Sequence, residues 1–139
     1  MNLETGNNLN LKSNSPALSI RNEYYSLHLK DGIGIAEYTP GIRISYEDAR
    51  EIVNQRLKVF GDISYPVLIK GNKVLKVDKD AREYLFSQGV ANFVAMAFIE
   101  RNPLEKMLAN AMIRLQPVGI PCRIFLSEET ALEWLRSHL

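Results

Sequence analysis

Apolar and polar residues alternate in the first patterned stretch of the chain, residues 24–30. A period of two is typical of a strand with one buried face. The pair Asp31–Gly32 follows, and these residue types favour the positive φ angles of a tight two-residue turn. The apolar positions of Ile33–Tyr38 then predict a returning strand. The pattern therefore predicts an antiparallel β-hairpin.

Four later segments place apolar residues at helical spacing, and each starts with a residue that can cap a helix. Ser45 and Asp48 predict a capping box for the first helix. Asp78, Asn102–Pro103 and Ser127 open the other three. The stripes expected to be buried are Tyr46, Ala49, Ile52, Val53, Leu57 and Phe60; Ala81, Tyr84 and Leu85; Leu104, Met107, Leu108, Ala111 and Leu115; and Ala131, Leu132, Leu135 and Leu139.

Short hydrophobic runs between these helices predict buried strands at residues 65–69, 91–99 and 122–126. The element order is β-β-α-β-α-β-α-β-α, which predicts a single α/β domain over residues 21–139. We expect about five strands in a mostly parallel sheet, with an antiparallel N-terminal hairpin and four helices. The Asn-rich segment 1–20 is expected to be a flexible tail, with a short ordered piece near Leu18–Ile20.

Composition limits the classes of function. Seventeen basic and sixteen acidic residues give a net charge of +1, so no nucleic-acid footprint is expected. No apolar run reaches the length of a bilayer span, and no secretory signal is visible, so we expect a cytoplasmic protein without membrane insertion. The single cysteine, Cys122, lies in a predicted strand and is expected to be a buried hydrophobic residue.

Catalytic signatures are missing from the sequence. The two histidines, His28 and His138, lie on a hairpin and in a last helical turn, so neither a Ser-His-Asp arrangement nor a metal cluster is expected. Gly71 is not followed by the lysine of a phosphate-binding loop. We expect no enzyme activity, no metal and no cofactor.

Ligands of open α/β sheets bind beyond the carboxyl ends of the strands, here in the loops after Ile69, Ile99 and Leu126. The first of these loops leads to a charged helix start, Asp78, Lys79, Asp80 and Ala81. A second candidate is a soft apolar pocket between the third helix and the sheet, because methionines can line an adaptable cavity. Its wall would be formed by Met96, Phe98, Met107, Leu108 and Met112, for which ordinary core packing is the alternative.

Over roughly residues 22–139 the chain resembles the STAS or SpoIIAA-like family, the fold of bacterial anti-sigma-factor antagonists. The resemblance rests on the element order, on the passage from Val67–Ile69 to Asp78–Ala81, and on the ending Phe125–Leu135. That ending, F-L-S-E-E-T-A-L-E-W-L, is similar to a phrase in an uncharacterised subgroup of small STAS-like proteins. Trp134 is then expected to anchor the last helix.

In signalling members of that family the second helix begins Asp-x-Ser-Gly, and phosphorylation of the serine switches partner binding. Asp78 matches the Asp and Lys79 the variable position, whereas Asp80 replaces the serine and Ala81 the glycine. A carboxylate cannot be phosphorylated as a serine is. The resemblance therefore implies a partner-binding site at these four residues without the serine switch.

Two functions follow as hypotheses. The first is a non-enzymatic regulatory or protein-interaction module whose unknown partner binds residues 78–81. The alternative is a carrier or sensor of an apolar small molecule or lipid, because other relatives of similar fold resemble lipid-binding modules. The hairpin at the expected sheet edge also offers a surface for homodimer formation.

Overall fold

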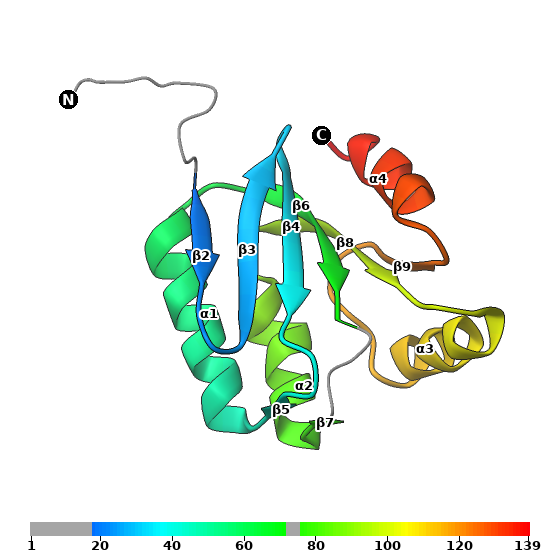
Figure 1. Cartoon of the computed structure of the whole chain (residues 1–139), viewed down its shortest axis with the longest axis horizontal. Coiled ribbons are helices and arrows are strands. Elements are labelled where there is room, and N and C mark those ends of the chain that lie inside the picture. Colours follow the sequence, from blue (N-terminus) through cyan, green and yellow to red (C-terminus); the bar gives the residue numbers. More distant parts are fainter. Residues whose placement is uncertain (1–17, 72–75) are drawn as a thin grey trace.

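A six-stranded mixed sheet forms the centre of the protein, shown in Figure 1 as a computed structural model that describes residues 18–71 and 76–139. Its strand order is β2-β3-β4-β6-β8-β9, antiparallel for the first two pairs and parallel for the rest. The strands are β2 (Ser19–Arg21), β3 (Tyr25–Lys30), β4 (Ile33–Tyr38), β6 (Tyr65–Lys70), β8 (Phe93–Ile99) and β9 (Cys122–Phe125). The predicted α/β class, mostly parallel sheet and antiparallel hairpin are confirmed.

The N-terminal edge of the sheet is β2, and the hairpin lies one strand further in. Ser19 pairs with His28 and Arg21 with Ser26, so the outer side of β3 is already hydrogen-bonded. The expectation that the hairpin forms a free edge is therefore wrong. The ordered piece foreseen near Leu18–Ile20 falls at this strand, whereas residues 1–17 of the tail expected over residues 1–20 lie outside the described residues.

The turn between β3 and β4 follows the sequence prediction. Asp31 has φ 54° and Gly32 has φ 84°, the two positive values that a type I′ turn requires. Lys30 and Ile33 then pair directly across the hairpin. This turn sets the register that brings Tyr25 and Leu27 to the buried face of β3.

Four α-helices and one 3-10 turn complete the fold, and the sequence predicts most of the helix N-caps. The helices are α1 (Tyr46–Phe60), α2 (Lys79–Ser87), α3 (Pro103–Leu115) and α4 (Glu128–Arg136), and the turn η1 (Gln88–Val90) follows α2. Ser45 and Asp48 form the predicted capping box, and Asn102 and Ser127 each accept a backbone N–H. Asp78 precedes α2 but makes no side-chain cap hydrogen bond.

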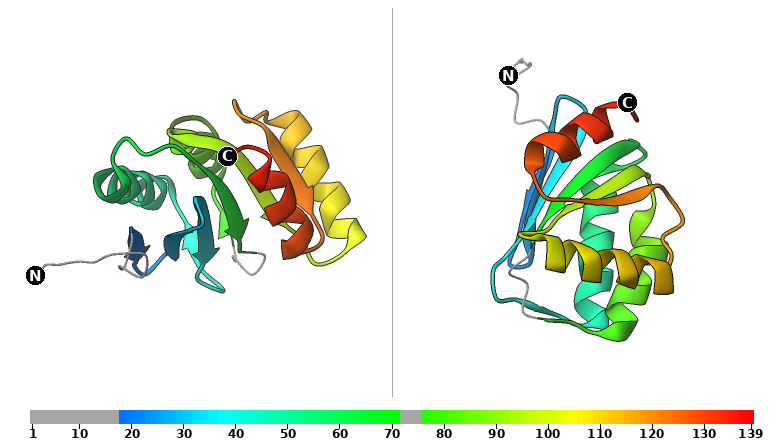
Figure 2. Two further views of the ribbon diagram at one scale, coloured as in Figure 1. Left: turned by 90° about the horizontal axis from the view of Figure 1, so that it is seen from above. Right: turned by 90° about the vertical axis from the view of Figure 1, so that its right-hand side faces the viewer.

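The helices lie in different places around the sheet. Figure 2 shows α1 and α2 on one face, α4 on the opposite face, and α3 at the end of the sheet beyond β9. Two short strands, β5 (Arg43–Ile44) and β7 (Lys76–Val77), form a separate parallel ladder just before α1 and α2. None of the helices in the two described stretches has the length and apolarity needed to cross a membrane.

Each face of the sheet has its own hydrophobic core, because side chains along a strand point alternately to opposite sides. On β6, Val67 belongs to the core under α1 and α2, and Leu68 belongs to the core under α4. Both side chains are fully buried. The two cores are therefore back to back through one sheet.

Helix α3 departs from its predicted burial. No residue of α3 is buried, and Leu104, Met107 and Leu115 are 61%, 58% and 84% exposed. Its main neighbour is β9 rather than a face of the sheet. Helical periodicity shows that a helix has an apolar side, but it does not show whether another element covers that side.

Candidate functional site

A cavity of about 170 Å³ lies between the sheet and the layer of α1 and α2. Strands β3, β4, β6 and β8 form its floor, and residues of α1, α2 and η1 form its roof. The side chains around it are Tyr25, Leu27, Ala36, Tyr38, Ile52, Val53, Arg56, Val67, Ile69, Val77, Arg82, Leu85, Phe86, Phe93, Met96 and Phe98, together with Gly89.

The cavity exists because α2 does not pack closely on the sheet. Helix α2 contacts mainly α1 and η1, and Ala81 is its one fully buried residue. Leu85 and Phe86, which face the cavity, are only half-buried. On the floor, Ala36 offers a single methyl group where a larger residue would fill space. Protein interiors normally leave few voids larger than a water molecule, so this gap is a feature to explain.

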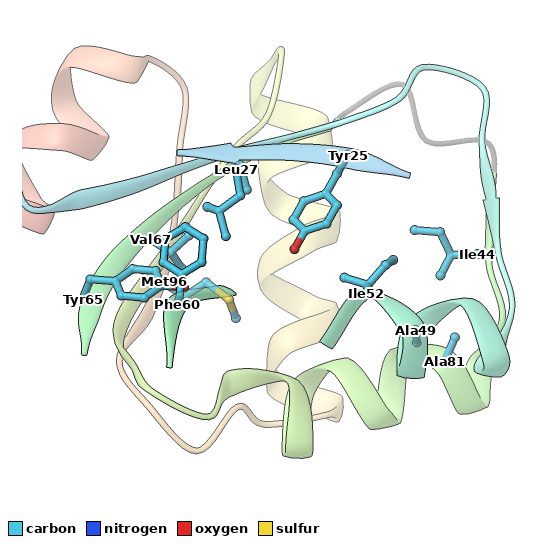
Figure 3. Packing of buried hydrophobic residues seen from close by; sticks show 11 residues of the cluster. Tyr25, Leu27, Ile44, Ala49, Ile52, Phe60, Tyr65, Val67, Ala81 and Met96 are labelled. Carbon is cyan, nitrogen blue, oxygen red and sulfur yellow. The ribbon is translucent and has the colours of Figure 1, made fainter. Parts of the chain in front are cut away.

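Tyr25 brings an unpaired polar group into this apolar space. Its side chain is 4% exposed, and its hydroxyl is the one buried side-chain polar atom among the described residues that has no hydrogen-bond partner. Figure 3 shows this hydroxyl pointing from the sheet toward the helix layer. Leaving such a group unpaired costs about 1–3 kcal/mol. Burial also raises the pKa of Tyr25 well above its usual value, so the hydroxyl keeps its proton.

Arg56 is the second polar group at the cavity. It is 3% exposed, and its guanidinium lies 4.1 Å from the centre of the Phe93 ring. Its Nη2 donates to the Gly89 carbonyl at 2.9 Å, and its Nη1 donates to the Ala91 carbonyl at 3.0 Å and to the Tyr65 hydroxyl at 3.4 Å. The side chain thereby ties α1 to η1 and to the start of β8.

Sequence reasoning missed both Arg56 and the role of Tyr25. A signal for Arg56 was present, because it lies one helical turn after Ile52 and one turn before Phe60, on the apolar side of α1. A charged residue in that stripe is seldom fully buried unless it has partners. Tyr25 lies on the buried side of a strand whose alternation over residues 24–30 predicts one buried face, but nothing in the sequence indicates that its hydroxyl is unpaired.

The predicted apolar pocket is divided between two regions. Met96 and Phe98 line the cavity. Met107, Leu108 and Met112 do not; they lie on α3 and are 58%, 59% and 42% exposed. The cavity lies under α1 and α2 rather than between α3 and the sheet, where the sequence placed it. The reason is the location of α3 at the end of the sheet.

The predicted partner-binding residues at the start of α2 do not share one environment. Lys79 and Asp80 are exposed, whereas Ala81 is completely buried against the core. Asp78 is half-buried, and its carboxylate lies 3.4 Å from the guanidinium of Arg43. A partner at this position would therefore contact Lys79 and Asp80 rather than the side chain of Ala81. Part of the preceding segment, Val74–Leu75, lies outside the described residues.

The carboxyl ends of the strands form a separate, open groove of about 350 Å³. It includes the ends of β4, β6 and β8 and the start of α4, as the position of the three loops predicted. Lys70 and Glu128 face each other here, with Nζ 3.3 Å from the carboxylate oxygen. The groove carries these paired charges and no unpaired buried group among its described residues.

The residues considered for catalysis or metal binding are dispersed. His28 is exposed on β3, and the His138 ring packs 4.6 Å from the ring of Trp134, which also contacts Phe125. Burial raises the pKa of the Cys122 thiol to about 11, so it remains protonated at neutral pH. No group of three or more potential metal ligands occurs within residues 18–71 and 76–139.

Comparisons with known proteins support the fold. The chain is similar to the crystal structure of an uncharacterized protein of the DUF3478 family with a SpoIIAA-like fold from Shewanella loihica PV-4. The TM-score is 0.53 at 14% identity, covering 80% of this chain and 91% of that one. A protein with unknown function from Arthrobacter sp. FB24 is 25% identical over 79% of this chain and 97% of its own length, with a TM-score of 0.29.

The SpoIIAA-like fold expected from the sequence is therefore confirmed. A family model described as a domain of unknown function, DUF7793, matches residues 27–139. No curated protein matches the sequence.

Proposed function

The chain belongs to the DUF7793 family, a domain of unknown function, so we propose a function from the site itself. The protein is a non-enzymatic module that binds a small, mainly apolar molecule under α1 and α2. The observation that carries this proposal is the cavity of about 170 Å³ containing the unpaired Tyr25 hydroxyl. A bound molecule would replace missing packing contacts and satisfy the hydroxyl. The role is that of a carrier or sensor in the cytoplasm.

Binding without chemical conversion fits the lining. The described residues around the cavity include no carboxylate, imidazole or thiol, which are the usual groups for proton transfer or nucleophilic attack at neutral pH. Burial raises the pKa of Tyr25, so its hydroxyl holds its proton in this setting, and the two arginine side chains offer only N–H donors. These groups are suited to orienting a ligand rather than to transforming it.

Native mass spectrometry of gently purified protein tests the proposal, combined with thermal shifts across a panel of small apolar molecules. We expect a retained mass or a stabilising ligand in the panel. The variant Ala36→Leu should fill the cavity and abolish the effect, because Ala36 lines it. Val94→Leu adds volume at an exposed position of β8 and serves as the matched control. No retained mass and no shift with any molecule would contradict the proposal.

A second candidate is the protein-interaction role inferred from the STAS-like subgroup, with its contact at the start of α2. The exposure of Lys79 and Asp80 favours it. The double variant Lys79→Ala/Asp80→Ala should lose partners that the unchanged protein retains from native lysate. Lys58→Ala/Glu133→Ala removes one charge of each sign from exposed positions elsewhere and is the control. If the unchanged protein and both double variants retain the same partners, this candidate is contradicted. The same result would contradict a homodimer formed through the start of α2.

A further inference from the structure

The wall of the cavity is positively charged. Arg56 reaches it from α1 and Arg82 from α2, and no acidic residue borders it among the described residues. Neither arginine lies within 4.0 Å of a carboxylate in residues 18–71 and 76–139. Arg82 donates from Nε to the side-chain oxygen of Gln116 at 2.8 Å, a neutral partner. A ligand carrying negative charge would complement this wall.

The Arg56 guanidinium also has N–H donors beyond the three hydrogen bonds that it makes to neighbouring oxygens. A buried cation loses its hydration, and carbonyl oxygens with one aromatic face compensate for that less fully than a counter-ion does. The guanidinium fork matches the planar geometry of a carboxylate. Arg56 is therefore suited to a carboxylate at the cavity.

The unpaired Tyr25 hydroxyl is an independent observation that points to the same ligand. It keeps its proton and has no acceptor among the described residues, so it can donate a hydrogen bond to a ligand oxygen. Tyr25 and Arg56 border the same cavity from opposite layers, one from β3 and one from α1. A negatively charged oxygen is the strongest acceptor for such a donor.

We propose that the cavity binds a small carboxylate, whose oxygens meet the Tyr25 hydroxyl and the Arg56 guanidinium while its apolar part packs among Val67, Met96 and Phe98. The inference rests on the proposed function and specifies its ligand class. A dry cavity of about 150 Å³ in another protein holds benzene. The present volume of about 170 Å³ therefore limits the apolar part to one ring or a short branched chain.

Tyr38 lies where the cavity adjoins the two open grooves. This residue lines the cavity and also the two open grooves beside it, and it is half-buried. Its ring packs edge-to-face on Tyr25, with 5.4 Å between centroids. Tyr38 therefore separates the proposed ligand position from both grooves.

Calorimetric titration with three matched probes tests the ligand class: benzoate, its neutral isostere benzamide, and toluene. At neutral pH we expect benzoate to bind at least about tenfold more tightly than benzamide, because a hydrogen bond to a charged group is worth more than one to a neutral group. Toluene should bind more weakly than benzoate, since it leaves the Tyr25 hydroxyl unpaired.

Two substitutions locate the binding. Tyr25→Phe removes only the unpaired hydroxyl, so the fold is kept, and it should weaken benzoate about tenfold while leaving toluene unchanged. Tyr24→Phe is the control, because the Tyr24 hydroxyl bonds Asp48 and does not border the cavity. Arg56→Gln should also weaken benzoate at least about tenfold, with the exposed Arg50→Gln as its control. If Arg56→Gln does not fold, the benzoate affinity of Tyr25→Phe still shows whether the carboxylate binds at the cavity.

The outcomes separate this inference from the proposed function. Equal affinity for benzoate and benzamide, or unchanged benzoate affinity in Tyr25→Phe, would overturn the carboxylate assignment while leaving an apolar binding module in place. Absence of binding by all three probes would also overturn it. The proposed function would then depend on the retained mass and the Ala36→Leu result, which do not involve these probes.

Discussion

The two faces of the sheet are built from the same strands, but the helices pack more closely on one face than on the other. Under α4, small side chains such as Ala97 and Ala131 let the helix approach until Leu68 and Leu135 are fully buried. Under α1 and α2, the residues of α2 that face the sheet are only half-buried, and a cavity remains beside a buried cation. One face is therefore a closely packed core, and the other contains a cavity.

The largest expected change in the free energy of unfolding comes from removing a leucine side chain from each face. Leu135→Ala should lower the free energy of unfolding by about 2–5 kcal/mol, because a closely packed face leaves a new void. Leu85→Ala on α2 should cost at least about 1 kcal/mol less, since Leu85 already borders empty space. Urea unfolding of both variants measures the difference. Equal costs would mean that the faces are packed alike.

Adding volume should destabilise the face under α4 but not the face that contains the cavity. Ala97→Val, at a completely buried position under α4, should destabilise by about 1–3 kcal/mol through overpacking. Ala36→Val has room in the cavity and should be neutral or stabilising by up to about 1 kcal/mol. Thermal unfolding of the pair distinguishes the two cases. Destabilisation by Ala36→Val comparable to that by Ala97→Val would contradict the cavity.

Within the cavity face, the two helices should also differ. Ser45→Ala removes one half of the α1 capping box and should cost about 1 kcal/mol. Asp78→Ala should cost less, because Asp78 makes no side-chain cap hydrogen bond and its contact with Arg43 is partly exposed to solvent. Chemical denaturation gives both values. A larger loss for Asp78→Ala would show that α2 is the more firmly fixed helix.

The smallest expected effect is on α3. Met107→Ala should change the free energy of unfolding by no more than about 0.5 kcal/mol, since the side chain is 58% exposed. Met96→Ala, at a buried position of the cavity floor, is the contrasting methionine and should cost clearly more. A large loss for Met107→Ala would imply that α3 is covered in solution.

Local patterns in the sequence were sufficient to predict most elements of the fold. The hairpin depends on alternation and on Asp31–Gly32, and the caps at Ser45, Asn102 and Ser127 depend on residues within one turn of each other. Such signals are complete within a few neighbouring positions. Pairing of β2 with β3 was less visible, because a three-residue strand is too short to establish a period.

The site could be predicted only in part, because it depends on distances between elements. Met96 and Phe98 were identified as apolar wall residues, but their partners were sought on α3. Whether α2 or α3 covers Met96 and Phe98 depends on where each helix lies. The spacing of residues in the sequence does not contain that information. Whether Tyr25 finds an acceptor, and whether Arg56 finds an acid, likewise depends on segments distant in the chain.

The β5–β7 ladder has an electrostatic consequence for the cavity face. Because these two strands are parallel and each leads directly into a helix, α1 and α2 begin side by side and run in the same direction. Their macrodipoles are therefore aligned, and the two positive ends repel each other. Glu47 and Asp48 in the first turn of α1, and Asp80 in that of α2, offset this repulsion. The negative charge of Asp80 at the start of α2 therefore favours the parallel arrangement of the two helices.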